Sequence, residues 1–357
     1  MQIRSLKLVN FRNYLSLKID FSPTLNIIIG KNGMGKTNLV EAIYVLALTK
    51  SFRSNNDKLM IYQDKDLFKI TGKIVDEGEN TLEIILNNEG KKAKINKTSC
   101  IKLSDYISKF RVIVFSPDDL RIIKSTPGER RKTLNMQLSQ LDNSYLKNLG
   151  CYNKLLKQRN SYLKTMYTNH NASIDYLDIL TDKLITYGES IYKQRKNYFA
   201  SLNEIIAKKY AKKETLIIKY MTDYDNYNKN KLKQKYKKSI NKDIILGATQ
   251  IGIHRDDYIF QFNNNDLKDF GSEGEQKNAV ITYKLAEIEL FYMRHHSYPV
   301  LILDDLLSEL DEGKIKNILK KINKKTQTFI TTVDEKIVTS GLIKEGKIFK
   351  IKDGKIT

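Results

Sequence analysis

The sequence predicts an α/β fold with a long helical insertion, and three observations support this prediction. Apolar runs of strand type fill the first third of the chain and return near the C-terminus. A glycine-rich loop stands between one of these runs and a helical pattern, and the middle of the chain carries apolar residues at intervals of three and four. With 357 residues, 41% of them apolar, the chain is long enough for about two or three domains with cores of their own.

The N-terminal part of the chain reads as a series of strands. Alternating and β-branched runs predict these strands at Ile3–Val9, Leu15–Phe21, Leu25–Ile29, Phe68–Val75, Thr81–Leu86 and Arg111–Phe115. Pro117 and Pro127-Gly128 then mark a change of period. We expect a first domain segment over residues 1–125.

The middle of the chain predicts two long antiparallel helices that form an arm, over residues 126–245. From Glu129 onward, apolar residues recur at helical spacing as far as Leu155, and a second series follows the turn-like segment Thr168–Ser173. We interpret this stripe as the arm's own packing seam rather than as a docking surface. Strands return at Thr215–Lys219 and Asp257–Phe262, and residues 246–357 alternate again between helix and buried strand.

The charge of the chain favours partners that carry dense negative charge. The chain has 62 Lys+Arg against 41 Asp+Glu, a net charge of +21, which favours nucleic acid first and acidic membrane surfaces second. The alternative is the compositional bias of an AT-rich genome. Asn228–Lys242 holds seven lysines and no acidic residue, which is typical of a phosphate-binding surface, although a solvated loop remains an open alternative.

Several function classes find no support in the sequence. No apolar run approaches the roughly twenty residues that span a bilayer, and the first residues alternate like a strand instead of forming a secretion signal. We therefore expect a cytoplasmic protein. Cys100 and Cys151 are too few for a disulfide framework, and the four histidines show no zinc-site spacing.

The segment Gly30–Thr37 matches the phosphate-loop spacing G-x-x-x-x-G-K-[ST], between the strand Leu25–Ile29 and a helical pattern. Small residues let backbone N–H groups wrap phosphates, Lys36 reaches the outer phosphates, and the Thr37 hydroxyl binds Mg²⁺. The loop predicts a nucleoside triphosphate site. Its candidate binding residues are Gly30, Lys31, Asn32, Gly33, Met34, Gly35, Lys36, Thr37 and Asn38.

Two further segments carry chemistry. The apolar run Val300–Leu303 ends in Asp304 and Asp305, and this pattern predicts that Asp304 supports Mg²⁺ while Asp305 acts as general base towards the attacking water. Ser272 and Gly274 lie in a Ser-x-Gly-Glu turn that leads into a helical pattern. Such a turn offers a hydroxyl, backbone N–H groups and a helix dipole to an anion.

Taken in order, these segments resemble an ATP-binding-cassette head of the SMC-like type. The resemblance narrows to the RecF family of bacterial recombination mediators and covers nearly the whole chain. The phrases that carry it are LKLVNFRNYLSLKIDFSPTLNIIIGKNGMGKTNLVEAIYVLALTKSFRS, VFSPDDLRIIKSTPGERRKTLN, GIHRDDYIF, GSEGEQKNAVITYKLAEIEL and LILDDLLSELD.

The resemblance implies an ABC-type, SMC-like P-loop ATPase head whose two parts, residues 1–125 and 246–357, flank the arm. It also implies an ATP- and Mg²⁺-dependent homodimer in which Ser272 and Gly274 of one copy close over the nucleotide of the other. Its DNA partners would be double-stranded and gapped DNA, and its protein partner would be RecR, with RecO, in loading recombinase on single strands. Lys36 and Asp305 are the catalytic candidates. Because Asp305 is one methylene shorter than the glutamate of many such heads, we expect slow hydrolysis.

Five residues depart from the family's usual pattern: Glu273, Glu275 and Lys277 in the signature turn, Ile253 in place of Pro, and Asn135 in place of Asp. We expect the two glutamates to lower the affinity of the closed dimer.

Three rival functions remain at this point: an ATPase subunit of a membrane transporter, a small-molecule kinase, and a DNA-binding scaffold without turnover. Two motifs also keep open roles. Arg53 reaches the nucleotide or DNA, or is an ordinary surface arginine. The charged cluster His254–Asp257 is marked by the resemblance, and a structural ion-pair network is an alternative.

Overall fold

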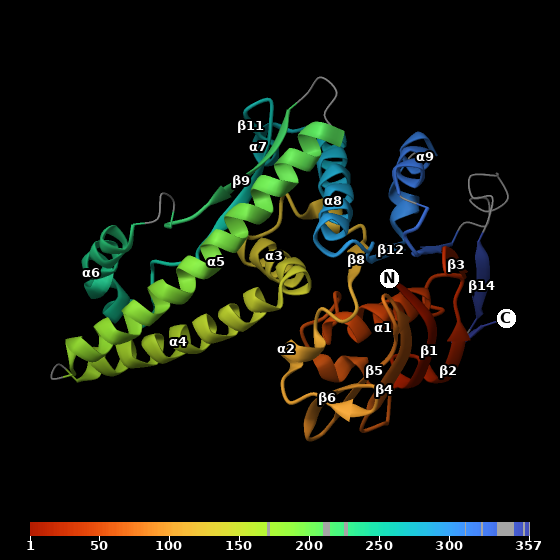
Figure 1. The fold of residues 1–357 in the computed structure, drawn as a ribbon, viewed down its shortest axis with the longest axis horizontal. Helices are drawn as coiled ribbons and strands as arrows, with labels where there is room; N and C mark the ends of the chain where they lie inside the picture. The colour runs from red at the N-terminus through yellow and green to blue at the C-terminus, as the bar shows by residue number, and fades with distance from the viewer. Residues whose placement is uncertain are drawn as a thin grey trace. The chain divides into compact units, whose positions relative to one another are not determined.

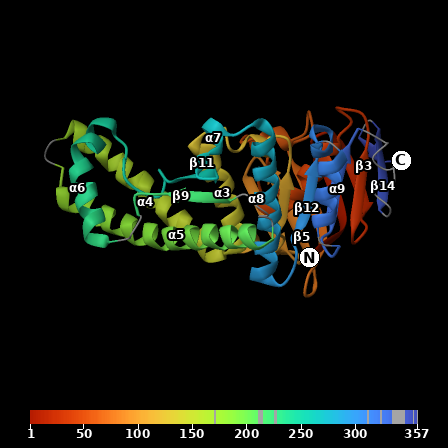
Figure 2. The ribbon, with the colours of Figure 1, turned by 90° about the horizontal axis from the view of Figure 1, so that it is seen from above.

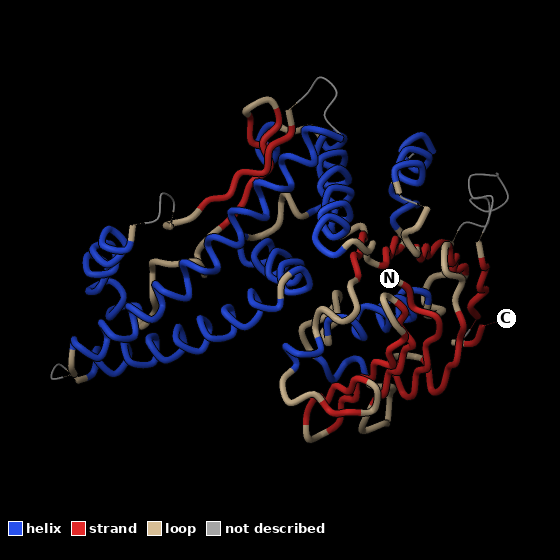
Figure 3. Tube along the Cα trace, viewed as in Figure 1, coloured by secondary structure: helices blue, strands red, loops and turns tan. Residues whose placement is uncertain are grey.

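The computed structural model of the chain describes residues 1–169, 172–209, 215–224, 228–310, 312–322, 324–333, 346–352 and 354–356. Contacts divide the chain into two compact units: unit 1 comprises Met1–Arg121 with Val280–Thr357, and unit 2 comprises Ile122–Ala279. Strands are concentrated in unit 1, whereas helices make up most of unit 2 (Figure 3). Among the described helices, none has the length and apolar character needed to cross a bilayer.

Unit 1 contains an antiparallel sheet of six strands in the order β2-β1-β4-β5-β6-β7. The strand bounds are β1 Gln2–Phe11, β2 Tyr14–Asp20, β4 Phe68–Val75, β5 Glu79–Asn87, β6 Gly90–Ile95 and β7 Thr98–Ser99. Alternate residues of β4 and β5 are buried, as expected for a sheet with one face on a core. The predicted strands of this region are confirmed within two residues at their ends.

The second sheet of unit 1 has the order β15-β14-β3-β13-β12-β8, with β14, β3, β13, β12 and β8 parallel. Its strands are β3 Leu25–Ile29, β8 Val112–Phe115, β12 Val300–Asp304, β13 Thr328–Thr332, β14 Lys347–Lys352 and β15 Lys355–Ile356. The strands β8, β12 and β13 are buried along their whole length, which explains their uninterrupted apolar character. Because β13 lies between β3 and β12, the carboxyl ends of all three meet at one edge.

Helix α1 (Lys36–Leu48) follows β3 and lies between the two sheets, since it contacts β1, β4 and β5 of one and β8, β12 and β13 of the other. Every residue from Leu39 to Leu48 is buried, so the helix is apolar on all sides except at Glu41. The remaining elements of unit 1 are η1 Asp57–Met60, α2 Leu103–Tyr106, η2 Asp119–Arg121, η3 Leu306–Glu309 and α9 Glu312–Lys321. Helix α8 (Glu273–His295) begins in unit 2 and continues in unit 1.

Unit 2 is built on a long antiparallel pair, α4 (Asn143–Thr168) and α5 (Ile174–Lys209), which lie side by side (Figure 1). At their shared end, Leu163, Met166 and Leu177 form an apolar cluster. Ile240 and Ile244 of α6 (Lys229–Leu246) pack against this cluster, and Figure 2 shows α6 beside this end of the pair. The predicted packing seam of the arm is therefore confirmed.

The rest of unit 2 surrounds this pair. A small antiparallel sheet has the order β11-β10-β9, and β9 runs along α5. The remaining bounds are α3 Pro127–Leu141, β9 Leu216–Met221, β10 Asp257–Phe262, β11 Asn265–Asp266 and α7 Leu267–Phe270.

The structure corrects one sequence prediction in unit 2 and decides against one alternative that the sequence left open. The first long helix is interrupted at Asp142, which ends α3 and begins α4 as its N-cap, its carboxylate accepting from Ser144 N at 2.8 Å. The lysine-rich segment from Asn228 is a helix and not a loop. Asn228 caps its start, and Gly247, at φ 57°, ends it.

The division into units also differs from the predicted domains. The expected boundary lay at residue 245, whereas residues 246–279 belong to unit 2. The physical reason is strand pairing, because β10 joins β9 of the arm over six residue pairs from Asp257 to Phe262.

Candidate nucleotide site

The phosphate loop connects β3 to α1 at the carboxyl edge of the parallel sheet. Gly33 and Gly35 have φ values of 82° and 111°, which favour glycine. A Cβ on Gly35 would also lie 2.5 Å from Asn13 Nδ2. Gly35 is the N-cap of α1 without a side-chain capping bond, and the first turn of α1 carries no acidic residue. The first N–H groups of this helix are therefore available to an anion.

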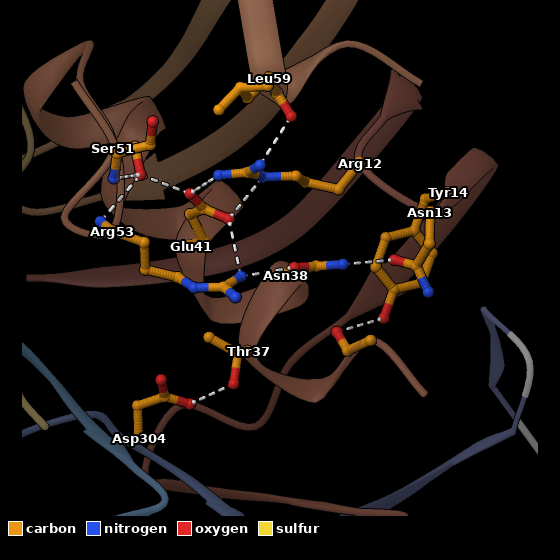
Figure 4. Close-up of polar contacts among 12 residues, drawn as sticks. Arg12, Asn13, Tyr14, Thr37, Asn38, Glu41, Ser51, Arg53, Leu59 and Asp304 are labelled. Atoms are coloured by element: carbon orange, nitrogen blue, oxygen red, sulfur yellow. Dashed lines mark hydrogen bonds and ion pairs between the residues drawn. The ribbon is translucent and has the colours of Figure 1, made fainter. Parts of the chain in front are cut away.

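Asn13, in the turn between β1 and β2, and Tyr14, the first residue of β2, contact the backbone of the loop (Figure 4). Asn13 Nδ2 donates to Met34 O at 3.2 Å, and Tyr14 Oη donates to Gly35 O at 2.9 Å. Asn38 Nδ2 of α1 donates to Asn13 Oδ1 at 2.9 Å. Burial raises the pKa of the Tyr14 phenol above its usual range, so the phenol stays protonated and remains a donor. Sequence reasoning missed these positioning residues, because no local pattern shows which turn packs on the loop.

A buried carboxylate anchors this region to α1. Glu41 is fully buried and accepts two hydrogen bonds from Arg12, at 2.6 and 2.9 Å, and one from Ser51 Oγ at 2.5 Å. The half-exposed Arg53 lies 3.5 Å from Glu41 Oε2 and donates to Asn38 Oδ1 at 2.8 Å. The charge of Glu41 is thus compensated (Figure 4). Arg53 is tied to the first turns of α1, and its contact with nucleotide or DNA remains a prediction.

The predicted magnesium residues come together across the sheet edge. Thr37 Oγ1 donates to Asp304 Oδ1 at 3.1 Å, and Thr331 Oγ1 donates to the same oxygen at 2.7 Å. Burial raises the pKa of Asp304, and the two hydroxyl donors oppose this rise. A hydroxyl and a carboxylate at the end of a phosphate loop are oxygen ligands of the kind that Mg²⁺ prefers, so these residues fit the ion.

The two catalytic candidates lie at the same edge. Asp305 has a left-handed φ of 48°, and its backbone N–H donates to Thr331 Oγ1 at 2.8 Å. Lys36 Nζ lies over the loop, donating to Lys31 O at 3.3 Å and to Asn32 Oδ1 at 3.5 Å. The structure thus brings all predicted residues of unit 1 together around one loop.

The signature turn lies in unit 2, at the start of α8. Ser272 N and Ser272 Oγ both donate to Glu275 Oε2 at 2.8 Å, and Glu275 N donates to Ser272 Oγ at 3.3 Å. These three bonds form a capping box. Gln276 Nε2 fixes the preceding turn by donating to Leu267 O at 2.7 Å and to Gly271 O at 3.1 Å. Ser272 and Gly274 are both exposed, so a second molecule can reach them.

The cluster His254–Asp257 is a structural network inside unit 2. It joins β10 and the segment before it to α3, α4 and α5, and the two arginines that pair with its aspartates, Arg130 and Arg195, are almost fully buried. This arrangement favours the ion-pair alternative over a catalytic role. The contacts are Asp256–Arg195 at 2.7 Å, Asp257–Arg130 at 2.6 Å and His254 Nδ1–Tyr152 Oη at 2.8 Å.

Comparison with known proteins places the chain in a family. Residues 2–357 match the family described as RecF/RecN/SMC N terminal domain. Over its whole length the chain is 40% identical to the DNA replication and repair protein RecF of Ligilactobacillus salivarius (strain UCC118), of which the alignment covers 97%. The chain belongs to the RecF family. The RecF protein of Geobacillus sp. (strain WCH70) is likewise 40% identical over 100% of this chain and 99% of its own length.

Solved structures agree with the RecF assignment. The structure described as the recombination mediator protein RecF-ATPrS in the RecFOR pathway has a TM-score of 0.90 and 33% identity, and covers 99% of this chain and 97% of its own. An Smc head domain from Pyrococcus furiosus has a TM-score of 0.52 at 16% identity over 100% of this chain and 96% of its own, which shows a shared fold alone. The predicted SMC-like ATPase head is thus confirmed, and the transporter and kinase alternatives do not describe a RecF protein.

Proposed function

We propose that this chain is an ATP-dependent DNA-binding protein of recombinational repair and replication restart. The observation that carries the proposal is the assembled site in unit 1, where the phosphate loop, Thr37 and Asp304 meet at one sheet edge. Two similar solved structures, described as RecF-ATP and RecF-ATPrS in the RecFOR pathway, support ATP as the nucleotide.

Each residue of the site has a role in this proposal. The N–H groups from Asn32 to Thr37 and the Lys36 ammonium hold the phosphates. Thr37 and Asp304 would hold Mg²⁺, which when bound supplies positive charge to the phosphate oxygens. Asp305 accepts a proton from the attacking water as general base. Its short side chain favours slow hydrolysis, so that hydrolysis would set the lifetime of the ATP-bound dimer.

Dimerisation completes the site. Ser272 and Gly274 of a second copy close over the outer phosphate, so the homodimer forms with ATP and separates after hydrolysis. The exposed position of both residues supports this step. The RecFOR pathway named for the solved relatives supports RecR, with RecO, as protein partners in loading recombinase on single strands.

The DNA partner is double-stranded or gapped DNA. The net charge of +21 and the lysine-rich helix α6 support it. Lys229, Lys231, Lys237, Lys238 and Lys242 are exposed and form no ion pair within the described residues.

The test is fluorescence anisotropy of labelled duplex and gapped DNA across a salt series, with no nucleotide, with ADP and with ATP. We expect binding to tighten at least about fivefold with ATP only, because closure of the dimer joins two basic surfaces. Lys36→Ala should lose this gain, since it removes the cation that holds the outer phosphates. The proposal would be overturned if binding is weak, equal under all nucleotides and steeply lost with salt. The positive charge would then cause nonspecific attraction to DNA only.

A further inference from the structure

In the proposed dimer, the N-termini of α1 and α8 both face the nucleotide, and they differ in their capping and in the acidic residues of their first turns. Helix α1 starts without any side-chain cap and without an acidic residue in its first turn. Helix α8 starts with Glu273 and Glu275 in its first turn, and the Glu275 carboxylate accepts from the backbone N–H and the hydroxyl of Ser272, the residue before the helix. One terminus is therefore open to a phosphate, and the other already holds an anion of its own.

Glu275 occupies the Ser272 hydroxyl, which is one of the groups that the proposed function assigns to the γ-phosphate. Both the backbone N–H and the hydroxyl of Ser272 point to one carboxylate oxygen of Glu275, each at 2.8 Å. We infer that Glu275 is a built-in competitor of the γ-phosphate, and that it must leave Ser272 before the signature turn closes on the nucleotide of a second copy. This inference rests on the proposed function, because it concerns the same composite site.

The two glutamates of the turn differ in whether a cation compensates their charge. Glu273 pairs with Lys277 at 3.0 Å, whereas Glu275 forms no ion pair within the part of the chain that the structure describes. The hydrogen bonds from Ser272 lower the pKa of Glu275, so the carboxylate is ionised at neutral pH. An incoming phosphate therefore meets both an occupied hydroxyl and a like charge.

The turn can release Glu275 without losing its shape. Ser272, Gly274 and Glu275 are exposed, so the side chain of Glu275 can move into solvent. The two bonds from Gln276 to the carbonyls of Leu267 and Gly271 hold the backbone independently of Glu275. Displacement thus costs one capping interaction and leaves the helix start in place.

The test variant is Glu275→Gln, which keeps the capping geometry and removes the charge. The chain supplies a matched control in the box at the start of α3, where Thr126 N and Thr126 Oγ1 donate to Glu129 Oε2 at 2.9 and 3.1 Å. Sedimentation velocity with ATPγS and Mg²⁺ should show a dimer dissociation constant about tenfold lower for Glu275→Gln than for wild type, since one repulsive charge is gone. Glu129→Gln should match wild type. The gain should shrink at high salt, where exposed charges are screened.

The possible results distinguish failure of this inference from failure of the proposed function. A wild-type dimer that needs ATPγS, with Glu275→Gln equal or weaker, overturns the role of Glu275 and leaves the proposed function standing. Glu275→Ala, which removes the cap as well, should still dimerise at least as tightly as wild type, and a weaker dimer would mark the glutamate as a structural cap only. The absence of an ATPγS-dependent dimer in wild type and all variants would overturn both.

Discussion

Asn13 and Tyr14 contact the phosphate loop at carbonyl oxygens, and they do so from a turn that precedes the loop by about twenty residues. Sequence patterns predicted roles for Lys36, Thr37 and Asp304 because each of these residues belongs to a short motif or a strand end. Asn13 and Tyr14 have no such signal. Their role depends on which turn the antiparallel sheet places against the loop, and this is a property of the fold.

Replacing Asn13 tests this positioning role. Asn13→Ala leaves the Met34 carbonyl and the Asn38 amide without their partner, and a lost hydrogen bond of this kind costs about 1–1.5 kcal/mol. We expect ATP affinity, measured by fluorescent-nucleotide titration, to fall about tenfold. The control is Asn80→Ala, which breaks a similar amide pair with Asn96 elsewhere in the same sheet. Equal affinity in both variants would show that the loop holds its shape unaided.

Helix α6 shows what element-scale patterns reveal and what they hide. Seven lysines without an acidic residue predicted a surface for phosphates and left a solvated loop as the alternative. The segment is a helix, because Leu232 and Tyr236 bury one stripe against the arm. At Asp142 the sequence predicted one continuous helix, because the apolar spacing continues across the boundary between α3 and α4. Strand β6 was missed because GKKAKI has a single buried residue, Ala93. Periodicity therefore found the elements that bury a full face and failed where burial is slight or a cap decides.

The lysines of α6 provide the prediction at this scale. Replacing the five exposed lysines that form no ion pair within the described residues by Gln should weaken duplex binding and lower the salt slope of log K by up to about 4.5, because each phosphate contact contributes about 0.9. Anisotropy over a salt series measures both effects. The changed lysines are Lys229, Lys231, Lys237, Lys238 and Lys242, and the control set of exposed lysines in unit 1 is Lys7, Lys18, Lys65, Lys97 and Lys102.

An equal loss of affinity and slope in the two sets would contradict a dedicated DNA surface on α6. The net positive charge of the whole chain, and not its position on α6, would then determine DNA affinity.

The candidate site residues of the whole molecule are divided between two compact units. The phosphate loop, Asp304 and Asp305 lie in unit 1, while Ser272 and Gly274 lie in unit 2. Both sets are predictions from the sequence motifs, and the RecF resemblance predicted the ATPase-head fold, which is confirmed. The boundary at residue 245 was not found correctly, because strand pairing between β9 and β10 has no signature in either strand alone.

Asp305→Asn tests the proposed cycle at this scale. The variant keeps the size of the side chain but cannot accept a proton, so phosphate release should fall at least about 100-fold. The ATP-dependent dimer should persist and last longer, as followed by sedimentation. Asp64→Asn, at an exposed turn of unit 1, is the control. Unchanged phosphate release would remove Asp305 from the general-base role, and loss of the dimer would assign it to binding.

The complete enclosure of α1 has a consequence for where the free energy of nucleotide binding goes. A helix buried from Leu39 to Leu48 between two sheets is among the stiffest parts of the molecule, because any tilt would open voids on both sides. The candidate phosphate loop is thus attached to a helix that resists displacement. In the proposed function, little of the free energy of nucleotide binding would therefore be lost in deforming this helix, and it would remain available for the proposed dimer contact.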